Sequence, residues 1–205
     1  MIKDFNKKLD LVFPNPKCEL NYNKDYELLI ATMLSAQCTD KRVNEVTSIL
    51  FNKYDIYSLS KANKADIEMI IRPLGSFSKK SEYMLEIAKK LVNDYDGIVP
   101  NNREYLETLP GVGRKTTNVV LSNLFDVPAI AVDTHVERVS KRLKLAYKND
   151  SVLTVEKKLM KKIPKDKWSR SHHQMVLFGR YICKAVKPEC GKCPFYNDCT
   201  SKDKK

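Results

Sequence analysis

The sequence Leu109-Pro110-Gly111-Val112-Gly113-Arg114-Lys115 predicts a tight reversal between two helices. Pro110 ends the first helix, because its ring cannot continue the helical turn and it has no N–H to donate. Gly111 and Gly113 permit backbone angles that a side chain would forbid, so the reversal can be very short. The second helix is expected to begin near Arg114, because apolar residues then recur at helical spacing: Val119, Val120, Leu121 and Leu124.

The N–H groups of this helix–hairpin–helix are expected to be unpaired and to face outward at a helix N-terminus. A phosphate of a nucleic-acid backbone fits such a loop, which here consists of Gly111, Val112, Gly113 and Arg114. Considered alone, the same residues are as typical of an ordinary turn between two core helices. Residues outside the hairpin therefore have to decide between a binding loop and a simple turn.

Lys115 and Asp133 add chemistry to the hairpin. Lys115 falls in the first turn of the second helix, where the positive end of the helix dipole disfavours a charged amine and so favours the neutral, nucleophilic form. Asp133 follows eighteen residues later, which leaves enough chain for one helix and a return loop. It is also a suitable N-cap for a further helix, a role that needs no chemistry. An amine and a carboxylate at one phosphate-binding site predict covalent attack on a sugar carbon.

The rest of the chain predicts helices and no strands, so the expected fold class is all-α. No segment alternates between apolar and polar residues over a strand length, and none has the eighteen apolar residues of a membrane span. The N-terminus has no apolar signal core, so a cytoplasmic protein is expected. The predicted helices cover about residues 2–12, 26–35, 40–50, 65–72, 78–95, 102–108, 114–125, 134–143, 154–163 and 168–183.

The net charge of +12 is distributed unevenly along the chain. Residues 1–133 contain 18 basic and 18 acidic residues, whereas residues 134–205 contain 19 and 7 and so carry the whole excess. A block of positive charge can simply keep a protein soluble. Together with the hairpin it favours a polyanionic partner, whose binding should weaken steeply with salt.

Four cysteines near the C-terminus, Cys183, Cys190, Cys193 and Cys199, have the spacing C-x6-C-x2-C-x5-C. Thiols so close in a cytosolic chain predict a metal site, since disulfides do not persist in that compartment. Zinc held by four cysteines is common, but the first gap is long for a zinc ribbon. The spacing alone leaves zinc and an iron–sulfur cluster open. In either case the site would order a basic surface that contains Lys184, Lys187 and Lys192.

Three motifs in this order resemble the endonuclease III family, the bifunctional DNA glycosylases and abasic-site lyases of base-excision repair. They are Leu-Pro-Gly-Val-Gly-Arg-Lys-Thr at 109–116, Val-Asp-Thr-His-Val at 132–136, and the four-cysteine pattern. The resemblance extends to residues 34–40, 79–80 and 172–180, and so runs over nearly the whole chain.

The resemblance implies a two-lobed helix–hairpin–helix DNA glycosylase fold. One lobe is a six-helix barrel over residues 19–127 that contains the hairpin. The other joins residues 1–18 to residues 128–205 and binds a 4Fe-4S cluster through the four cysteines. The resemblance thus favours an iron–sulfur cluster over zinc at the four cysteines.

The resemblance also implies a role for individual residues. Lys115 would be the nucleophile that forms a Schiff base and cleaves 3′ to the abasic site by β-elimination, with Asp133 as its activating and charge-stabilising partner. Glu107 and His135 would line the base pocket. The implied partner is double-stranded DNA with oxidised pyrimidines or abasic sites, bound by a nucleoid-associated monomer. The expected DNA contacts are Gln37, Ser76, Phe77, Gly111, Val112, Gly113 and Arg114.

One loop departs from the family pattern. Endonuclease III enzymes usually have Gly-Leu-Tyr before the helix that here is expected at Ser78, and that leucine wedges into the duplex. This chain has Leu74-Gly75-Ser76-Phe77 instead, and serine cannot replace lost stacking area. Either Phe77 or Leu74 is the wedge, or base flipping is less efficient and depends more on Gln37. Phe77 is equally suited to pack inward as a core aromatic.

Two alternative functions remain open at this point. An adenine-mismatch glycosylase of the same superfamily would lack Lys115 and carry a further C-terminal domain. A catalytically silent DNA-binding module would use the hairpin and the cysteines for docking alone. The presence of both Lys115 and Asp133 disfavours the silent module.

Overall fold

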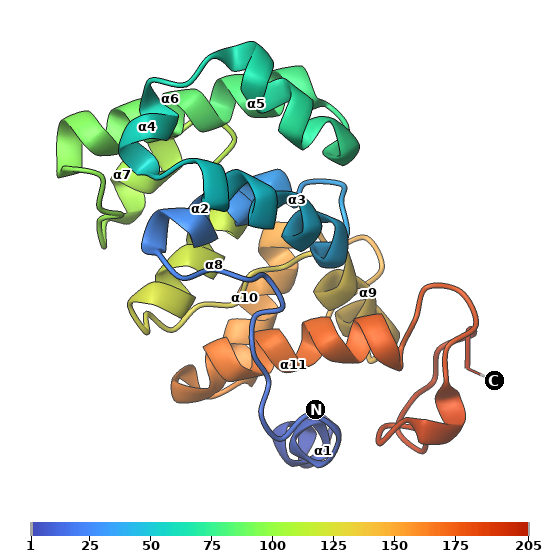
Figure 1. Cartoon of the computed structure of the whole chain (residues 1–205). Helices are drawn as coiled ribbons and strands as arrows, with labels where there is room; N and C mark the ends of the chain where they lie inside the picture. The colour runs from blue at the N-terminus through green and yellow to red at the C-terminus, as the bar shows by residue number, and fades with distance from the viewer. Residues whose placement is uncertain (1, 205) are drawn as a thin grey trace. The chain divides into compact units, whose positions relative to one another are not determined.

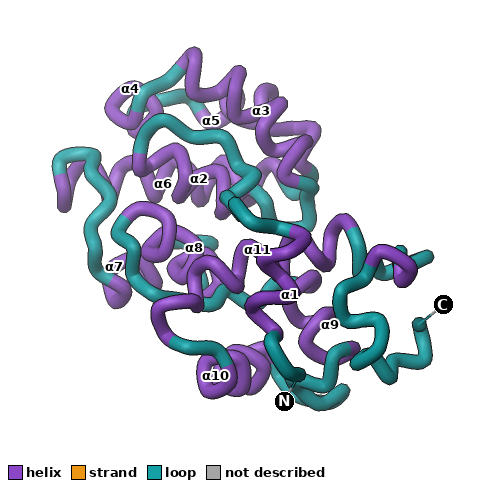
Figure 2. The backbone as a smooth tube through the Cα atoms, turned by 90° about the horizontal axis from the view of Figure 1, so that it is seen from below, coloured by secondary structure: helices purple, strands orange, loops and turns teal. Residues whose placement is uncertain are grey.

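The computed structural model describes residues 2–204, and every regular element in that range is a helix (Figures 1 and 2). The all-α prediction is therefore confirmed. The chain divides into two compact units, one of residues 18–125 and one of residues 1–17 with 126–205. We call them the hairpin unit and the cysteine unit. Their bounds lie one or two residues from the lobe boundaries implied by the resemblance.

The hairpin unit is built around α2 (Asp25–Leu34), whose residues from Tyr26 to Leu34 are all buried. Helices α3, α6 and α8 pack against it, which explains why most of its side chains after the acidic first turn are apolar. The other elements of this unit are α3 (Asp40–Lys53), α4 (Ile56–Ser60), α5 (Lys64–Ile71), the 3-10 helix η1 (Arg72–Leu74), α6 (Phe77–Tyr95), α7 (Arg103–Thr108) and α8 (Arg114–Leu124).

The cysteine unit joins the N-terminal helix to the last third of the chain. Phe195, which is fully buried, packs against Phe5 and Phe178 with ring centroids 5.3 and 5.4 Å apart. Arg170 adds an ion pair to Asp10, with Nη2 2.7 Å from the carboxylate. The elements of this unit are α1 (Phe5–Val12), α9 (Thr134–Arg142), α10 (Val152–Lys162), η2 (Lys165–Lys167), α11 (Trp168–Tyr181) and η3 (Cys190–Lys192).

No helix within residues 2–204 is both long enough and apolar enough to cross a membrane.

Candidate active site, nucleic-acid interface and metal centre

The hairpin between α7 and α8 depends on Gly111. Its φ of +73° lies in the left-handed region, which side-chain-bearing residues rarely adopt. A Cβ atom there would also lie 2.7 Å from Cδ2 of Tyr83 and 3.2 Å from Cγ of Met33. The backbone of the hairpin therefore rests directly on side chains of α6 and α2, and glycine is required on both counts.

Two details of the predicted hairpin are wrong. Gly113 has φ −102° and ψ −177°, an extended conformation open to any residue, and an added Cβ would meet no atom within 4 Å. The second detail is the Val112 amide, which was expected to be unpaired. It donates to the Leu109 carbonyl at 3.1 Å. Within residues 2–204, the amides of Gly111 and Gly113 have no acceptor. These two groups and the N-terminus of α8 are what the hairpin offers to an anion.

Lys115 and Glu107 lie on either side of this hairpin. Lys115 is exposed in the first turn of α8, and its amine forms no ion pair with the part of the chain described. Glu107 is exposed in the last turn of α7, where Arg103 Nη1 donates to its carboxylate at 3.0 Å. Arg103 Nη2 also donates to the buried Asn118 of α8 at 2.7 Å. Arg103, which the sequence did not single out, thereby joins the two helices.

The two other loops expected to contact DNA belong to the same unit. Gln37, after α2, and Ser76, before α6, are exposed and have φ of +60° and +45°. Leu74 is only 3% exposed, so its side chain is not available as a wedge. Phe77 is half-buried, and the Arg72 guanidinium lies 5.8 Å from its ring centroid. No fully exposed apolar side chain therefore occupies the wedge position.

In the cysteine unit, Asp133 is the N-cap of α9, as predicted. Its Oδ1 accepts a hydrogen bond from the Val136 amide at 2.8 Å, and the side chain is half-buried. His135 follows in the first turn, with Nδ1 3.2 Å from Nη2 of Arg138. Gly179 of α11 packs so closely on His135 that a Cβ there would lie 2.8 Å from the His135 Cβ.

Arg138 holds this corner of α9 against α11. Its guanidinium donates to the Gly179 carbonyl at 2.6 Å and to the Cys183 carbonyl at 3.1 Å. Burial lowers the pKa of Arg138, but an arginine remains charged at neutral pH. Sequence reasoning missed this residue, because an arginine on a basic helix carries no distinctive signal.

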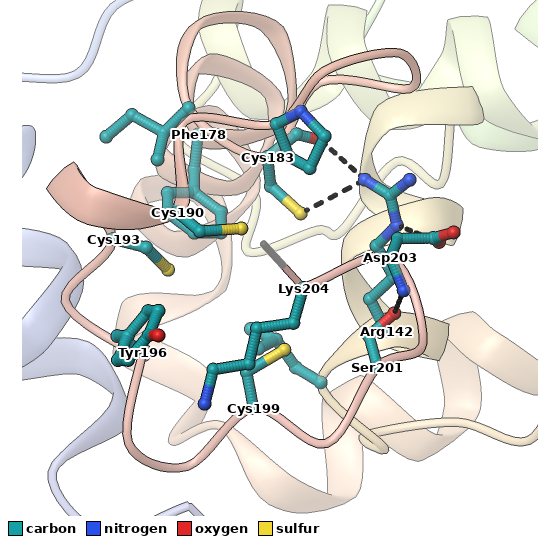
Figure 3. A pocket seen from close by; sticks show the side chains of 13 residues that line it. Arg142, Phe178, Cys183, Cys190, Cys193, Tyr196, Cys199, Ser201, Asp203 and Lys204 are labelled. Carbon is teal, nitrogen blue, oxygen red and sulfur yellow. Dashed lines mark hydrogen bonds and ion pairs between the residues drawn. The ribbon is translucent and has the colours of Figure 1, made fainter.

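The four predicted metal ligands line one pocket, together with Phe178 and Ile182 (Figure 3). Cys183, Cys190, Cys193 and Cys199 form no disulfide. Arg142 Nη1 lies 3.5 Å from Sγ of Cys183 and donates to the Lys184 carbonyl at 2.5 Å. Burial raises the pKa of the Cys193 thiol to about 11. In residues 2–204 no three His, Cys, Asp or Glu side chains are arranged to hold a single metal ion.

Comparison with known proteins places this geometry in a family. The family model for the HhH-GPD superfamily of base excision DNA repair proteins matches residues 30–165. Endonuclease III of Bacillus subtilis is 47% identical over 202 residues, which are 97% of this chain and 91% of that protein. Endonuclease III of Escherichia coli is 41% identical over 192 residues, which are 93% of this chain and 90% of that protein.

Solved structures give the same result. A non-covalent endonuclease III–DNA complex has 50% identity and a TM-score of 0.91, covering 95% of this chain and 91% of that one. A trapped endonuclease III–DNA covalent intermediate has the same identity and TM-score and covers 95% and 92%. The chain belongs to the endonuclease III family, within the HhH-GPD superfamily of base excision DNA repair proteins.

Proposed function

We propose that this protein is a bifunctional DNA glycosylase and abasic-site lyase that removes oxidised pyrimidines from duplex DNA. The observation that carries the proposal is the exposed amine of Lys115, which follows the hairpin directly in the first turn of α8. A covalent DNA intermediate has been trapped for a related endonuclease III, which supports a nucleophile in this chain too. A DNA-binding module without chemistry could use this lysine only as a phosphate contact, and it would form no covalent intermediate.

The chemistry follows from the residues in their proposed roles. A damaged base leaves the stack at a cost of a few kcal/mol, which is smallest when it is already poorly paired. The neutral amine of Lys115 attacks C1′ while the glycosidic bond breaks and its electron pair leaves with the base. The Asp133 carboxylate stabilises the positive charge that develops on the sugar. The adduct loses its ammonium proton and its C1′–O4′ bond opens, so that O4′ takes the electron pair and a proton and a Schiff base forms between C1′ and Lys115. The Schiff base acidifies the C2′ hydrogen, and β-elimination removes that proton, forms the C2′–C3′ double bond and breaks the C3′–O bond, with the phosphate as the leaving group.

The remaining parts are assigned to binding. Gly111, Gly113 and Arg114 receive a backbone phosphate, Gln37 fills the gap left by the flipped base, and Glu107 and His135 line the base pocket. Residues 18–125 form the lobe that carries the hairpin, and the other unit carries the metal centre. The protein acts as a monomer in the cytoplasm, associated with the nucleoid. A DNA complex of a related endonuclease III supports a duplex partner.

The four cysteines are proposed to hold a 4Fe-4S cluster. A single zinc ion needs four sulfurs about 2.3 Å from one point, whereas each sulfur in a cluster binds its own iron. The four cysteines line one pocket, and four thiol donors are the ligand set of such a cluster, which supports the assignment together with the family. When bound, the cluster would supply structural order to the basic loop and no step of the base excision.

Metal content tests this assignment. Protein purified from iron-replete, anaerobic culture should be brown and contain about four irons per chain. Cys190→Ala should lose the colour and weaken DNA binding, because the loop from Cys183 to Cys199 is no longer fixed. One tightly bound zinc and no iron in the same preparation would overturn the assignment.

Borohydride trapping tests the nucleophile. The wild-type protein should be trapped on duplexes that carry either one thymine glycol or one abasic site. Lys115→Gln should bind the same DNA and give no trapped complex. If trapping persists in Lys115→Gln, the nucleophile is another residue. Binding without incision by the wild-type protein would instead favour the silent module.

Asp133 needs a pair of variants, because it is also a helix cap. Asn caps helices as well as Asp does, so Asp133→Asn should keep the unfolding free energy and lose most turnover. Asp133→Ala should lose turnover and also about 1 kcal/mol of stability. Full turnover in Asp133→Asn would reduce the residue to a structural cap.

A further inference from the structure

Lys80, in the first turns of α6, has a buried ammonium group that the proposed chemistry does not use. The residue is only 7% exposed. Its Nζ lies 2.9 Å from the Ala36 carbonyl oxygen, 2.9 Å from the Leu74 carbonyl oxygen and 3.5 Å from Sγ of Cys38. An ammonium has three protons to donate, so these contacts use all of them.

The acceptors of Lys80 belong to two separate segments, and each segment leads into a proposed DNA contact. Ala36 directly precedes Gln37, and Leu74 stands two residues before Ser76. Gln37 and Ser76 both have left-handed backbones, with φ of +60° and +45°. Such a conformation costs free energy in a residue other than glycine, and it persists only where the surroundings enforce it.

A second bond ties the same two segments together. The Cys38 thiol donates to the Leu74 carbonyl oxygen at 2.9 Å, so this oxygen receives both the thiol and the ammonium. Ala36 lies just after the C-terminus of α2, and Leu74 is the last residue of η1. The carbonyl ends of helices favour a positive charge. A neutral side chain of the same length would remove the Lys80 donor from both carbonyls and leave the Leu74 oxygen with the Cys38 thiol alone.

We propose that Lys80 is a positioning residue that holds the Gln37 and Ser76 loops at a fixed separation for entry into the duplex. The proposal rests on the proposed function, because it assumes that both loops probe DNA. Lys80 acts through Gln37 and Ser76 and touches neither the base nor the sugar. Its removal should therefore impair the extrusion of a base from the stack and leave the later covalent step intact.

The test compares Lys80→Met with Lys89→Met. Methionine keeps most of the length of the lysine side chain and removes the charge and the donors. Lys89 is an exposed lysine further along α6 and provides the matched control. Single-turnover excision is measured on a damaged base in well-paired duplex and on the same base in single-stranded DNA. Hydrogen exchange is measured for the amides of residues 35–38 and 74–77.

Lys80→Met should reduce excision from duplex by roughly tenfold to a hundredfold, the loss expected when reacting parts are misplaced by about 1 Å. Excision from single strands should change by less than about threefold, since no base has to be extruded there. Amides of the two loops should exchange faster, while those of α2 and α8 should not. Lys89→Met should match the wild type in every measurement.

Three outcomes would overturn the proposal: equal losses on duplex and single strands, faster exchange throughout the hairpin unit, or no change at all. If Lys80→Met does not fold, Cys38→Ala removes the thiol bond to Leu74 and the 3.5 Å contact with Lys80 but keeps both ammonium–carbonyl bonds. It should give a smaller loss that is still confined to duplex. A wild-type protein without excision activity would refute the proposed function. The exchange measurement would still decide whether Lys80 fixes the two loops.

Discussion

At the scale of single residues, the two glycines of the hairpin should tolerate a methyl group very differently. In Gly111→Ala the new Cβ would lie 2.7 Å from the Tyr83 ring at a φ of +73°. Strain of this kind costs about 1–3 kcal/mol. Gly113 is extended and has open space around it, so Gly113→Ala should change stability by less than about 0.5 kcal/mol. Urea denaturation of both variants measures the difference.

DNA binding adds a second measurement on the same pair. If a phosphate approaches the Gly113 amide, the methyl group of Gly113→Ala stands in its way, and binding weakens although the fold is intact. A Gly113→Ala variant with unchanged stability and unchanged affinity would show that this glycine serves neither the fold nor the phosphate. Equal destabilisation of the two variants would contradict the contacts of Gly111 with α6.

At the scale of the elements, the turn into α6 lacks an apolar wedge. Ser76 is exposed and Leu74 is buried. Ser76→Leu should therefore speed excision from well-paired duplex roughly fivefold, which corresponds to about 1 kcal/mol of recovered stacking. Single-stranded substrates should change little. Ser78→Leu, at an exposed position inside α6, controls for added apolar surface.

Variants of Phe77 distinguish a turn without a wedge from a turn in which Phe77 is the wedge. If Phe77 is the wedge, Phe77→Ala should be folded and inactive, and Ser76→Leu should match the wild type on both substrates. If no apolar side chain of the turn enters the duplex, Gln37→Ala should lose more activity than Phe77→Ala. The half-buried ring beneath Arg72 favours the second result, because a side chain packed there is only partly free to enter a duplex.

The helices themselves were predictable wherever the apolar period ran for two turns or more. α4 was missed, because its five residues are too few to show a period, although Asp55 caps it through the Ser58 amide at 2.7 Å. The left-handed backbone conformations of Gln37 and Ser76 could not be predicted from the sequence either. They lie next to the carbonyls bound by Lys80, which is 44 residues from Ala36 in sequence. A contact between residues so far apart in the chain cannot be inferred from the local sequence.

At the scale of the whole molecule, all of the net charge lies in one unit. The hairpin unit contains 14 basic and 14 acidic residues, whereas the cysteine unit contains 23 and 11 and carries the entire +12. We therefore expect the salt-dependent part of DNA binding to come mainly from the cysteine unit. The hairpin unit would contribute directed hydrogen bonds and the extrusion of the base.

Within the cysteine unit, the three lysines near the metal centre are not equivalent. Lys184 and Lys192 both donate to Glu189, Lys192 at 2.9 Å, and these bonds lower the pKa of Glu189 to about 2. The carboxylate thus stays ionised at neutral pH and offsets part of their charge. Lys187 is exposed at a φ of +51° and forms no ion pair within residues 2–204. It is the lysine of this loop most available to a phosphate.

Lys187→Ala should therefore weaken binding about equally for all DNA sequences. It should also reduce the slope of log K against log salt by about 1, the value for one lost phosphate contact. Lys89→Ala removes the same charge from the neutral hairpin unit and should leave the slope unchanged. Affinities measured between low and physiological salt, on damaged and undamaged duplex, give both slopes. An unchanged slope in Lys187→Ala would mean that the phosphate contacts of this unit lie elsewhere, on α9, α10 or α11, and that the cysteine loop does not face the DNA.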